Sequence, residues 1–254
     1  MRPDLSLLES NLKPDSTIKQ TLETYKSAAS SSAVKSRNPT KLNLDAAIFD
    51  IGFVVGRLII DGFDCSAVRR GIEVPVNIDR VESMSSVGAL FILLVQNDAT
   101  YMELAEERFY NRFPCIIVRA GQPAVATQQF LIKMKEEFEL PVLAVVDPDP
   151  FGIYLLSVYS RSMPDIKWLG VRPSDLDKYS IPEGCRLPMT ERDMEYMEAL
   201  LKTDFVKNDS GREKELKLLM DDKYKTECEA LGSLGIHFLN DIYLPWKLQE
   251  MDWL

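Results

Sequence analysis

Residues 141–153 read PVLAVVDPDPFGI, an apolar run that ends in two aspartates, Asp147 and Asp149. The run from Pro141 to Val146 is short and continuous, which is typical of a strand buried on both faces of a sheet. Residues Phe151 to Tyr159 follow as a predicted helix. A strand that passes through a polar turn into a helix is the repeating unit of a parallel α/β sheet.

The same alternation extends on both sides of this stretch. Upstream, the pattern predicts strands over 91–95 and 115–118 and helices over 98–113 and 125–139. Downstream, it predicts a strand over 166–171, then helices over 212–225 and 228–235 and a closing apolar segment over 236–248. We therefore expect an α/β fold with a parallel sheet flanked by helices, followed by a helical C-terminal part.

The N-terminal third of the chain has a different composition. Residues 1–42 contain a Ser/Ala/Lys-rich stretch with few large apolar side chains, which is typical of a flexible segment. The stretch from Phe53 to Ile60 is rich in branched residues and is closed by Asp61-Gly62, so it predicts β structure and a turn. The expected division is a flexible segment over 1–42, linker strands over 43–84 and the α/β domain over 85–254.

Composition narrows the classes of partner. The net charge of −9 favours a protein partner, because nucleic-acid binding surfaces gather Lys and Arg against the phosphates. The four cysteines lie far apart without a C-x-x-C pair, which argues against a disulfide framework and against a zinc site. No apolar run approaches the roughly 18 to 20 residues that span a bilayer, so we expect no membrane partner.

The two aspartates after the third predicted strand are the strongest candidate site. Carboxylates at i and i+2 of an extended chain lie on the same side, and such oxygen ligands suit Mg²⁺. Pro148 and Pro150 restrict the backbone and would hold that geometry. In the alternative interpretation the pair forms a turn, with Asp149 capping the following helix.

Four segments of the sequence match motifs of a known family, in the same order. They read FILLVQNDA from Phe91, VRAGQPAVATQ from Val118, VDPDPFGI from Val146 and IKWLGVRPSD from Ile166, and IYLPWKL from Ile242 follows them. Together they resemble the A subunit of DNA topoisomerase VI and the related meiotic double-strand-break-forming recombination proteins. The resemblance implies a Toprim domain that binds Mg²⁺, in a nuclear protein that binds DNA. It also implies a homodimer formed through Toprim and, as a further partner, a topoisomerase VI B-like subunit.

The departures from the family pattern fall on polar site positions. Gln96 stands where the family has a metal-binding glutamate, and lysine, aspartate and arginine are replaced by Ala120, Ala124 and Gln128. A glutamine carbonyl coordinates weakly, carries no charge and cannot act as a general base. The resemblance therefore implies a weak or partial Mg²⁺ site made of the two aspartates and Gln96. The family also has a loop where Tyr159–Pro164 bridges directly.

The family's nucleophile is a tyrosine in an R-x-x-x-Y-Y setting, in a winged-helix domain before Toprim. Only the tail of that domain is recognisable here, over Leu44–Ile60. Tyr25 is the only tyrosine before residue 101, and it has neither a neighbouring tyrosine nor the matching arginine. We therefore do not expect Tyr25 to be a nucleophile and assign no catalytic residue. His237 is the sole histidine, and no motif supports a catalytic triad around it.

Three hypotheses follow. The first is that the protein is a Mg²⁺-dependent DNA transesterase, similar to the ATP-dependent type II topoisomerases and to the proteins that form meiotic breaks. Gln96 argues against this hypothesis. The second is a non-catalytic relative (a pseudoenzyme) that acts as an interaction or dimerisation module. The third is a truncated splice form. We expect that this polypeptide alone does not cleave DNA.

Overall fold

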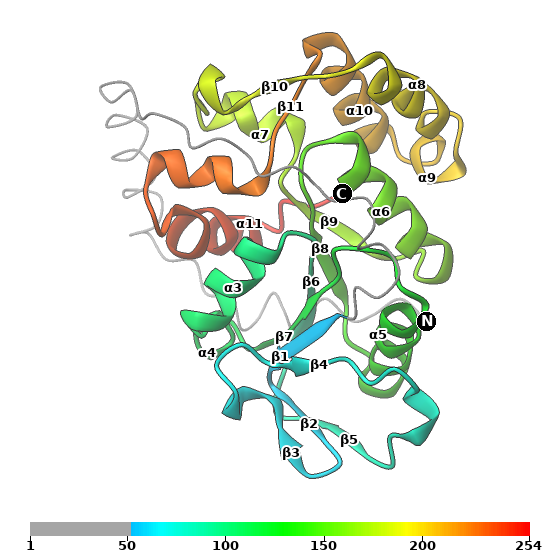
Figure 1. The fold of residues 1–254 in the computed structure, drawn as a ribbon, viewed down its shortest axis with the longest axis vertical. Helices are drawn as coiled ribbons and strands as arrows, with labels where there is room; N and C mark the ends of the chain where they lie inside the picture. The colour runs from blue at the N-terminus through cyan, green and yellow to red at the C-terminus, as the bar shows by residue number, and fades with distance from the viewer. Residues whose placement is uncertain (1–51) are drawn as a thin grey trace. The chain divides into compact units, whose positions relative to one another are not determined.

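The computed structural model describes residues 52–254, drawn in colour in Figure 1. The segment 1–42 and Tyr25 lie outside the described residues. The chain divides into two compact units. The first contains the described residues up to Val145 together with Val158–Trp168, and the second contains Val146–Ser157 and Leu169–Leu254.

A six-stranded sheet in the order β4-β1-β7-β6-β8-β9 forms the centre of the fold. Its strands are β1 (Phe53–Gly56), β4 (Ile72–Glu73), β6 (Phe91–Val95), β7 (Cys115–Arg119), β8 (Val142–Val145) and β9 (Lys167–Gly170). Strand β6 pairs in parallel with both β7 and β8, as the alternating pattern predicted. The α/β class is confirmed, although β1 pairs antiparallel with β4 and β7 and so makes the sheet mixed.

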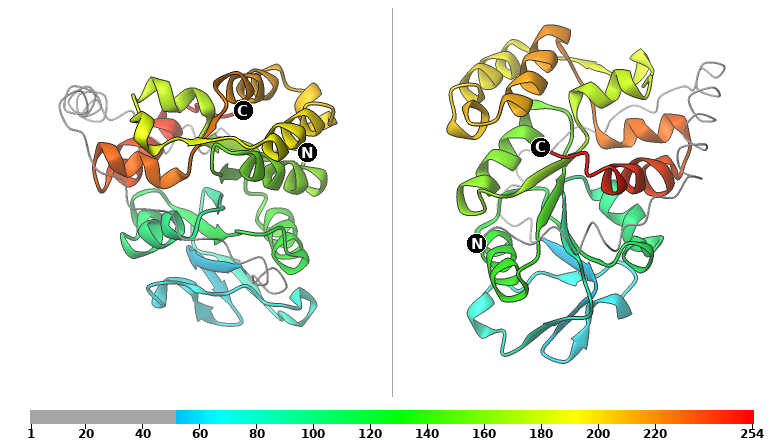
Figure 2. Two further views of the ribbon diagram at one scale, coloured as in Figure 1. Left: turned by 45° about the horizontal axis from the view of Figure 1, so that its top comes forward. Right: turned by 180° about the vertical axis from the view of Figure 1, so that it is seen from behind.

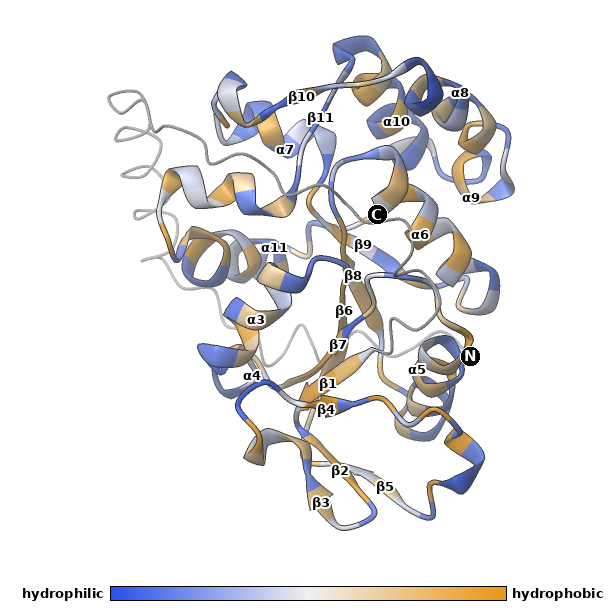
Figure 3. Cartoon of the chain, viewed as in Figure 1, coloured by the Kyte–Doolittle hydropathy of each residue, from blue (hydrophilic) through white to orange (hydrophobic). Residues whose placement is uncertain are grey.

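Helices cover both faces of the sheet in the first unit. In Figure 1, α3 (Asp98–Glu106) and α4 (Phe109–Arg112) lie on one side of the strands and α5 (Val125–Phe138) lies on the other. All five residues of β6 are buried, and Figure 3 shows the strands as an apolar layer. The continuous helix predicted over 98–113 is wrong, because Arg108 adopts a left-handed conformation (φ 50°) and divides it into α3 and α4.

A small three-stranded sheet in the order β3-β2-β5 belongs to the same unit. Its strands are β2 (Leu58–Ile60), β3 (Phe63–Asp64) and β5 (Met84–Ser86), and the short 3-10 helices are η2 (Cys65–Ala67) and η3 (Ile78–Arg80). The predicted turn at Asp61-Gly62 is confirmed by positive φ at both residues. The predicted β segment 53–60 is two strands, separated near Gly56, where an added Cβ would collide with the Cys115 carbonyl oxygen.

The second unit is mainly helical. Its elements are α7 (Pro173–Lys178), η4 (Glu183–Cys185), β10 (Leu187–Pro188), α8 (Glu191–Leu200), α9 (Asp204–Lys207), α10 (Ser210–Asp222), β11 (Tyr224–Lys225), η5 (Cys228–Leu234), η6 (Leu239–Tyr243) and α11 (Leu244–Gln249). Helices α7, α8 and α9 contact α10, and Figure 2 shows α8, α9 and α10 as one group. Helix α6 (Pro150–Ser162) begins in this unit and ends in the first.

Three local predictions need revision in this unit. The helix predicted over 212–225 ends at Asp222, and the next residues form β11, which pairs antiparallel with β10. The helix predicted over 228–235 is a 3-10 helix. Helix α6 runs through Tyr159 to Ser162, so part of the predicted bridge is helical. No helix among residues 52–254 combines the length and the apolar character needed to cross a membrane.

Candidate functional site

Asp147 and Asp149 follow the carboxyl end of β8. The backbone ladder continues past the strand, because Val146 N–H donates to the Gly170 carbonyl at 2.7 Å and Val171 N–H donates to the Val146 carbonyl at 2.8 Å. Asp147 is buried, with 7% of its surface exposed, and Asp149 is half-buried. The second unit thus holds both carboxyl groups in a short loop between a strand and the start of α6.

Each carboxylate accepts a hydrogen bond from a backbone N–H group. Cys228 N–H donates to Asp147 Oδ1 at 2.7 Å, and Gly152 N–H donates to Asp149 Oδ1 at 2.6 Å. The second bond is the helix-cap interaction of the alternative interpretation, since Asp149 directly precedes α6. It engages one oxygen of Asp149, so capping and ion binding are compatible roles for this residue.

Burial and carboxylate charge dominate the electrostatic environment of the loop. Burial and the neighbouring Asp147 charge raise the pKa of Asp149 to about 7, although the Gly152 hydrogen bond and the Lys225 charge oppose this rise. Burial and the charge of Asp147 also raise the pKa of Glu227. Desolvated carboxyl groups with raised pKa values close together are typical of sites that receive a cation.

Lys225, whose charge acts on Asp149, is paired with a residue of a helix cap. Lys225 Nζ lies 2.8 Å from Asp193 Oδ2. Asp193 belongs to the capping box of α8. Its carboxylate accepts from Thr190 N–H at 2.9 Å, and its N–H donates to Thr190 Oγ1 at 3.2 Å. Burial works against the Asp193 charge, but the bonds from Lys225 and Thr190 outweigh it and lower the pKa of Asp193.

The positions that depart from the family pattern lie in the first unit. Gln96 directly follows β6, and its N–H donates to the Val145 carbonyl at 3.0 Å. Ala120 is buried after β7, and Gln128 Nε2 donates to the Pro123 carbonyl at 2.8 Å. Ala124 occupies the N-cap position of α5 without a side-chain cap bond. Alanine cannot supply the side-chain cap bond that an aspartate at this position could make.

The loop of residues 147–149, here called the D-x-D loop, offers carboxylate oxygens. These donors fit Mg²⁺, which prefers carboxylate oxygens and retains several waters. Among residues 52–254, no three His, Cys, Asp or Glu side chains are arranged to hold a metal ion. The two aspartates are therefore a partial donor set. Their burial and the raised pKa of Asp149 are the features that a divalent cation would compensate.

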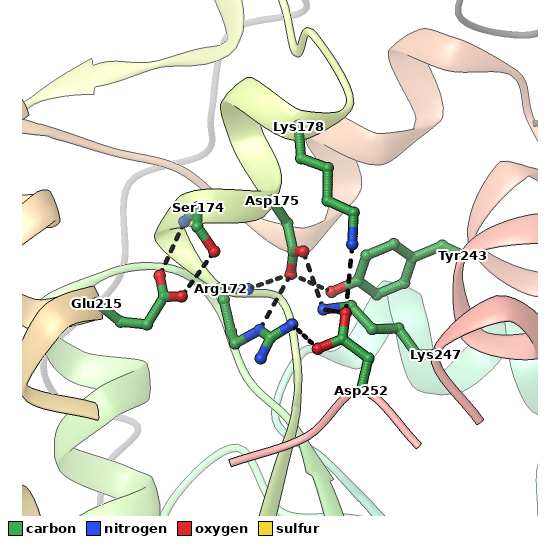
Figure 4. Close-up of polar contacts among 8 residues, drawn as sticks. All are labelled: Arg172, Ser174, Asp175, Lys178, Glu215, Tyr243, Lys247 and Asp252. Atoms are coloured by element: carbon green, nitrogen blue, oxygen red, sulfur yellow. Dashed lines mark hydrogen bonds and ion pairs between the residues drawn. The ribbon is translucent and has the colours of Figure 1, made fainter. Parts of the chain in front are cut away.

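A second polar cluster lies within the second unit, where the IKWLGVRPSD segment meets the end of the chain (Figure 4). Asp175 accepts from Tyr243 Oη at 2.7 Å and lies 2.9 Å from Lys247 Nζ. Asp252 lies 3.2 Å from the same ammonium and also pairs with Arg172. The side chains of Asp175 and Lys247 are 1% and 0% exposed, so this cluster is a buried structural network.

The second cluster also joins α7 to α10. Ser174 donates to Glu215 from its backbone N–H at 2.9 Å and from its hydroxyl at 2.6 Å. Burial opposes the charge of Asp252, but the Lys247 and Arg172 charges lower its pKa to about 2. Every cation in the network faces a carboxylate, so the network joins the PSD segment to the PWK segment and the end of the chain.

A family model for the Toprim domain of Spo11 and the topoisomerase 6 A subunit matches residues 91–248, which is more than half of the chain. The chain belongs to this family. The match begins at β6 and ends within α11, so it contains the D-x-D loop and the buried network. Toprim domains generally bind Mg²⁺, in agreement with the donor types of the loop.

Individual relatives agree with this assignment. The chain is 54% identical to the A subunit of DNA topoisomerase 6 from Arabidopsis thaliana, over 85% of this chain and 54% of the relative. It is 33% identical to meiotic recombination protein SPO11-1 of the same plant, over 83% of this chain and 63% of the relative. It is 33% identical to human SPO11, over 75% of this chain and 52% of the relative. The chain thus spans between 52% and 63% of the length of these relatives.

Sequence reasoning missed two charged residues of this Toprim domain that act on the D-x-D loop. Lys225 and Glu227 were assigned to no site, because 78 or more residues separate them from Asp147 and neither belongs to a local motif. Only the pairing of 226–228 with the loop reveals them. The family resemblance singles out Asp147, Asp149 and Gln96, since those positions fall on recognisable segments, and their role as metal ligands stays a prediction.

Proposed function

We propose that this Toprim domain acts on DNA in the nucleus, as a protein of the topoisomerase 6 A-type whose own catalytic capacity is impaired. Its identity is 54% to the plant topoisomerase and 33% to SPO11-1, which favours the topoisomerase type over the meiotic type. In this proposal the domain division is the one expected from sequence, with remnant winged-helix strands over 43–84 and Toprim over 85–254.

The observation that carries the proposal is that the site has its two aspartates but has a neutral glutamine where the family has a glutamate. The D-x-D carboxylates are present and held by backbone N–H groups, while the neutral Gln96 follows the neighbouring strand β6. Bound Mg²⁺ would supply positive charge to phosphodiester oxygens, and Asp147 and Asp149 would hold it. Gln96 adds no negative charge and cannot accept a proton, so both ion affinity and proton transfer are reduced.

The test is DNA cleavage by the full chain. After incubation with supercoiled DNA and Mg²⁺, we expect no protein-linked 5′ ends above the level seen with Asp147→Ala. Calorimetry should give Mg²⁺ affinity weaker than micromolar, since a site with two carboxylates binds weakly. Covalent protein–DNA ends, or a micromolar Kd that Asp147→Ala abolishes, would contradict the proposed impairment.

A second candidate is a non-catalytic interaction module, either a homodimer or a partner of a topoisomerase VI B-like subunit. The net charge of −9 supports it, because that charge opposes binding to polyanionic DNA. Sedimentation and DNA-binding measurements on the full chain separate the two candidates. A dimer without measurable DNA affinity at about 0.1 M salt would favour the interaction module.

A further inference from the structure

The segment that enters η5 runs alongside the D-x-D loop. Thr226 N–H donates to the Pro148 carbonyl at 3.4 Å, and Cys228 N–H donates to Asp147 Oδ1 at 2.7 Å. Glu227 lies between these two donors. Its Cα position beside the loop is therefore set by a hydrogen bond on each side, and both bonds belong to the same unit of the structure.

The Glu227 side chain is exposed to solvent, on a backbone segment that is paired with the loop. The residue is exposed and extended (φ −98°, ψ 157°), and its carboxylate makes no cap bond to η5. Its charge interacts with that of Asp147. A glutamate has three rotatable side-chain bonds, so the carboxylate can turn toward the loop while the paired backbone stays in place.

The nearby lysine does not neutralise this glutamate. Lys225, two residues earlier, forms its ion pair with Asp193 at 2.8 Å. Asp147, Asp149 and Glu227 thus bring three carboxyl groups to one loop. Mg²⁺ binds carboxylate oxygens and keeps several waters, so a third carboxylate at the loop can replace one of those waters.

We propose that Glu227 supplies the third carboxylate for the divalent cation of this Toprim domain, in place of the charge that Gln96 lacks. This inference rests on the proposed Mg²⁺ site and adds a ligand to it. The ion would be held by Asp147 and Asp149 from the loop and by Glu227 from the segment paired with it. The side chains of residues 52–254 as they lie hold no three-carboxylate group, so binding includes a rotation of Glu227.

Glu229 provides a matched control. It is also exposed, lies two residues further along in η5, and loses the same single charge when changed to glutamine. Mn²⁺, an EPR-active ion with Mg²⁺-like ligand preferences, can be titrated into the full chain while free Mn²⁺ is measured. We expect Glu227→Gln to weaken Mn²⁺ binding about tenfold, and Glu229→Gln to change it by less than about twofold.

The outcomes separate this inference from the function on which it rests. If Glu227→Gln binds as tightly as Glu229→Gln while Asp147→Asn loses binding, the Glu227 assignment is wrong and the D-x-D site stands. If the unaltered chain binds no Mn²⁺, or if Asp147→Asn binds as well as it does, the proposed metal site itself is wrong. Near-UV circular dichroism checks the fold of each variant, and Glu227→Ser replaces Glu227→Gln if the latter does not fold.

Discussion

Replacing Asp175 by asparagine should destabilise the second unit, because it leaves the Lys247 ammonium buried without its closest carboxylate. The two groups are 2.9 Å apart and their side chains are 1% and 0% exposed (Figure 4). Asparagine keeps the shape of the side chain and can still accept the Tyr243 hydroxyl bond, which is 2.7 Å long in the unaltered chain. The substitution therefore removes the charge that faces Lys247 and Arg172 while it keeps the size of the side chain.

The magnitude follows from what remains around the lysine. Breaking a buried ion pair by removing one partner costs roughly 3–5 kcal/mol. Asp252 still lies 3.2 Å from Lys247 and is only 24% exposed, so it retains part of the compensation. We therefore expect a loss near the lower limit, about 3 kcal/mol. With a urea m-value of roughly 2–3 kcal/mol/M, the midpoint should fall by about 1 M.

The assay is urea unfolding of the full chain at pH 7, followed by circular dichroism. Glu213→Gln serves as the control, because its ion pair with Lys217 is exposed and should contribute less than about 0.5 kcal/mol. Lys247→Met should also destabilise, and the double variant should lose about 1–3 kcal/mol less than the sum of the two single losses. If Asp175→Asn shifts the midpoint no more than the Glu213 control does, the buried pair does not stabilise this fold.

Three further predictions concern single positions. The raised pKa of Asp149, about 7, means that the folded chain keeps this proton while the unfolded chain loses it near 3.8, so ionisation lowers stability as pH rises through that window. Asp149→Asn should therefore be more stable than the unaltered chain at pH 8 by more than about 1 kcal/mol, and this difference in stability should shrink toward pH 4 in unfolding titrations. A difference that stays the same from pH 8 to pH 4 would contradict the burial of the carboxyl group. Thr190→Ala removes the capping box of α8 and should cost about 1 kcal/mol in urea unfolding, with equal midpoints counting against it. Gly170→Ala should lower the free energy of unfolding by about 1–3 kcal/mol, because its Cβ would overlap the Tyr243 hydroxyl. The double variant that adds Tyr243→Phe should lose less stability than the two single variants lose together. Strict additivity of the two losses would exclude the clash.

The sequence predicted the scaffold well because burial leaves a local pattern. The run FILLV at 91–95 is entirely buried as β6, and the valine-rich run before Asp147 is entirely buried as β8. Strands of this kind need no distant information, since their apolar continuity already requires a sheet covered on both faces. The same reasoning placed Asp147 and Asp149 after a strand end.

Predictions failed where a long-range contact or a single backbone angle decides the structure. Strand β11 forms because Tyr224 and Lys225 pair with Pro188 and Leu187, and no residue near β11 in the sequence indicates that pairing. The break after α3 depends on the left-handed conformation of Arg108, a residue type that ordinarily continues a helix. Local periodicity carries no signal for either feature.

The sequence by itself determined the fold class, the family and the two aspartates of the loop, because these depend on apolar runs and on motifs of adjacent residues. Tertiary structure alone decided which charged side chains face one another. Lys247 would be expected in solvent, yet it is buried because Asp175 and Asp252 fold against it. The backbone at Glu227 lies beside the loop because Thr226 and Cys228 donate hydrogen bonds to Pro148 and Asp147. Electrostatic partners depend on distance in space, which residue order does not record.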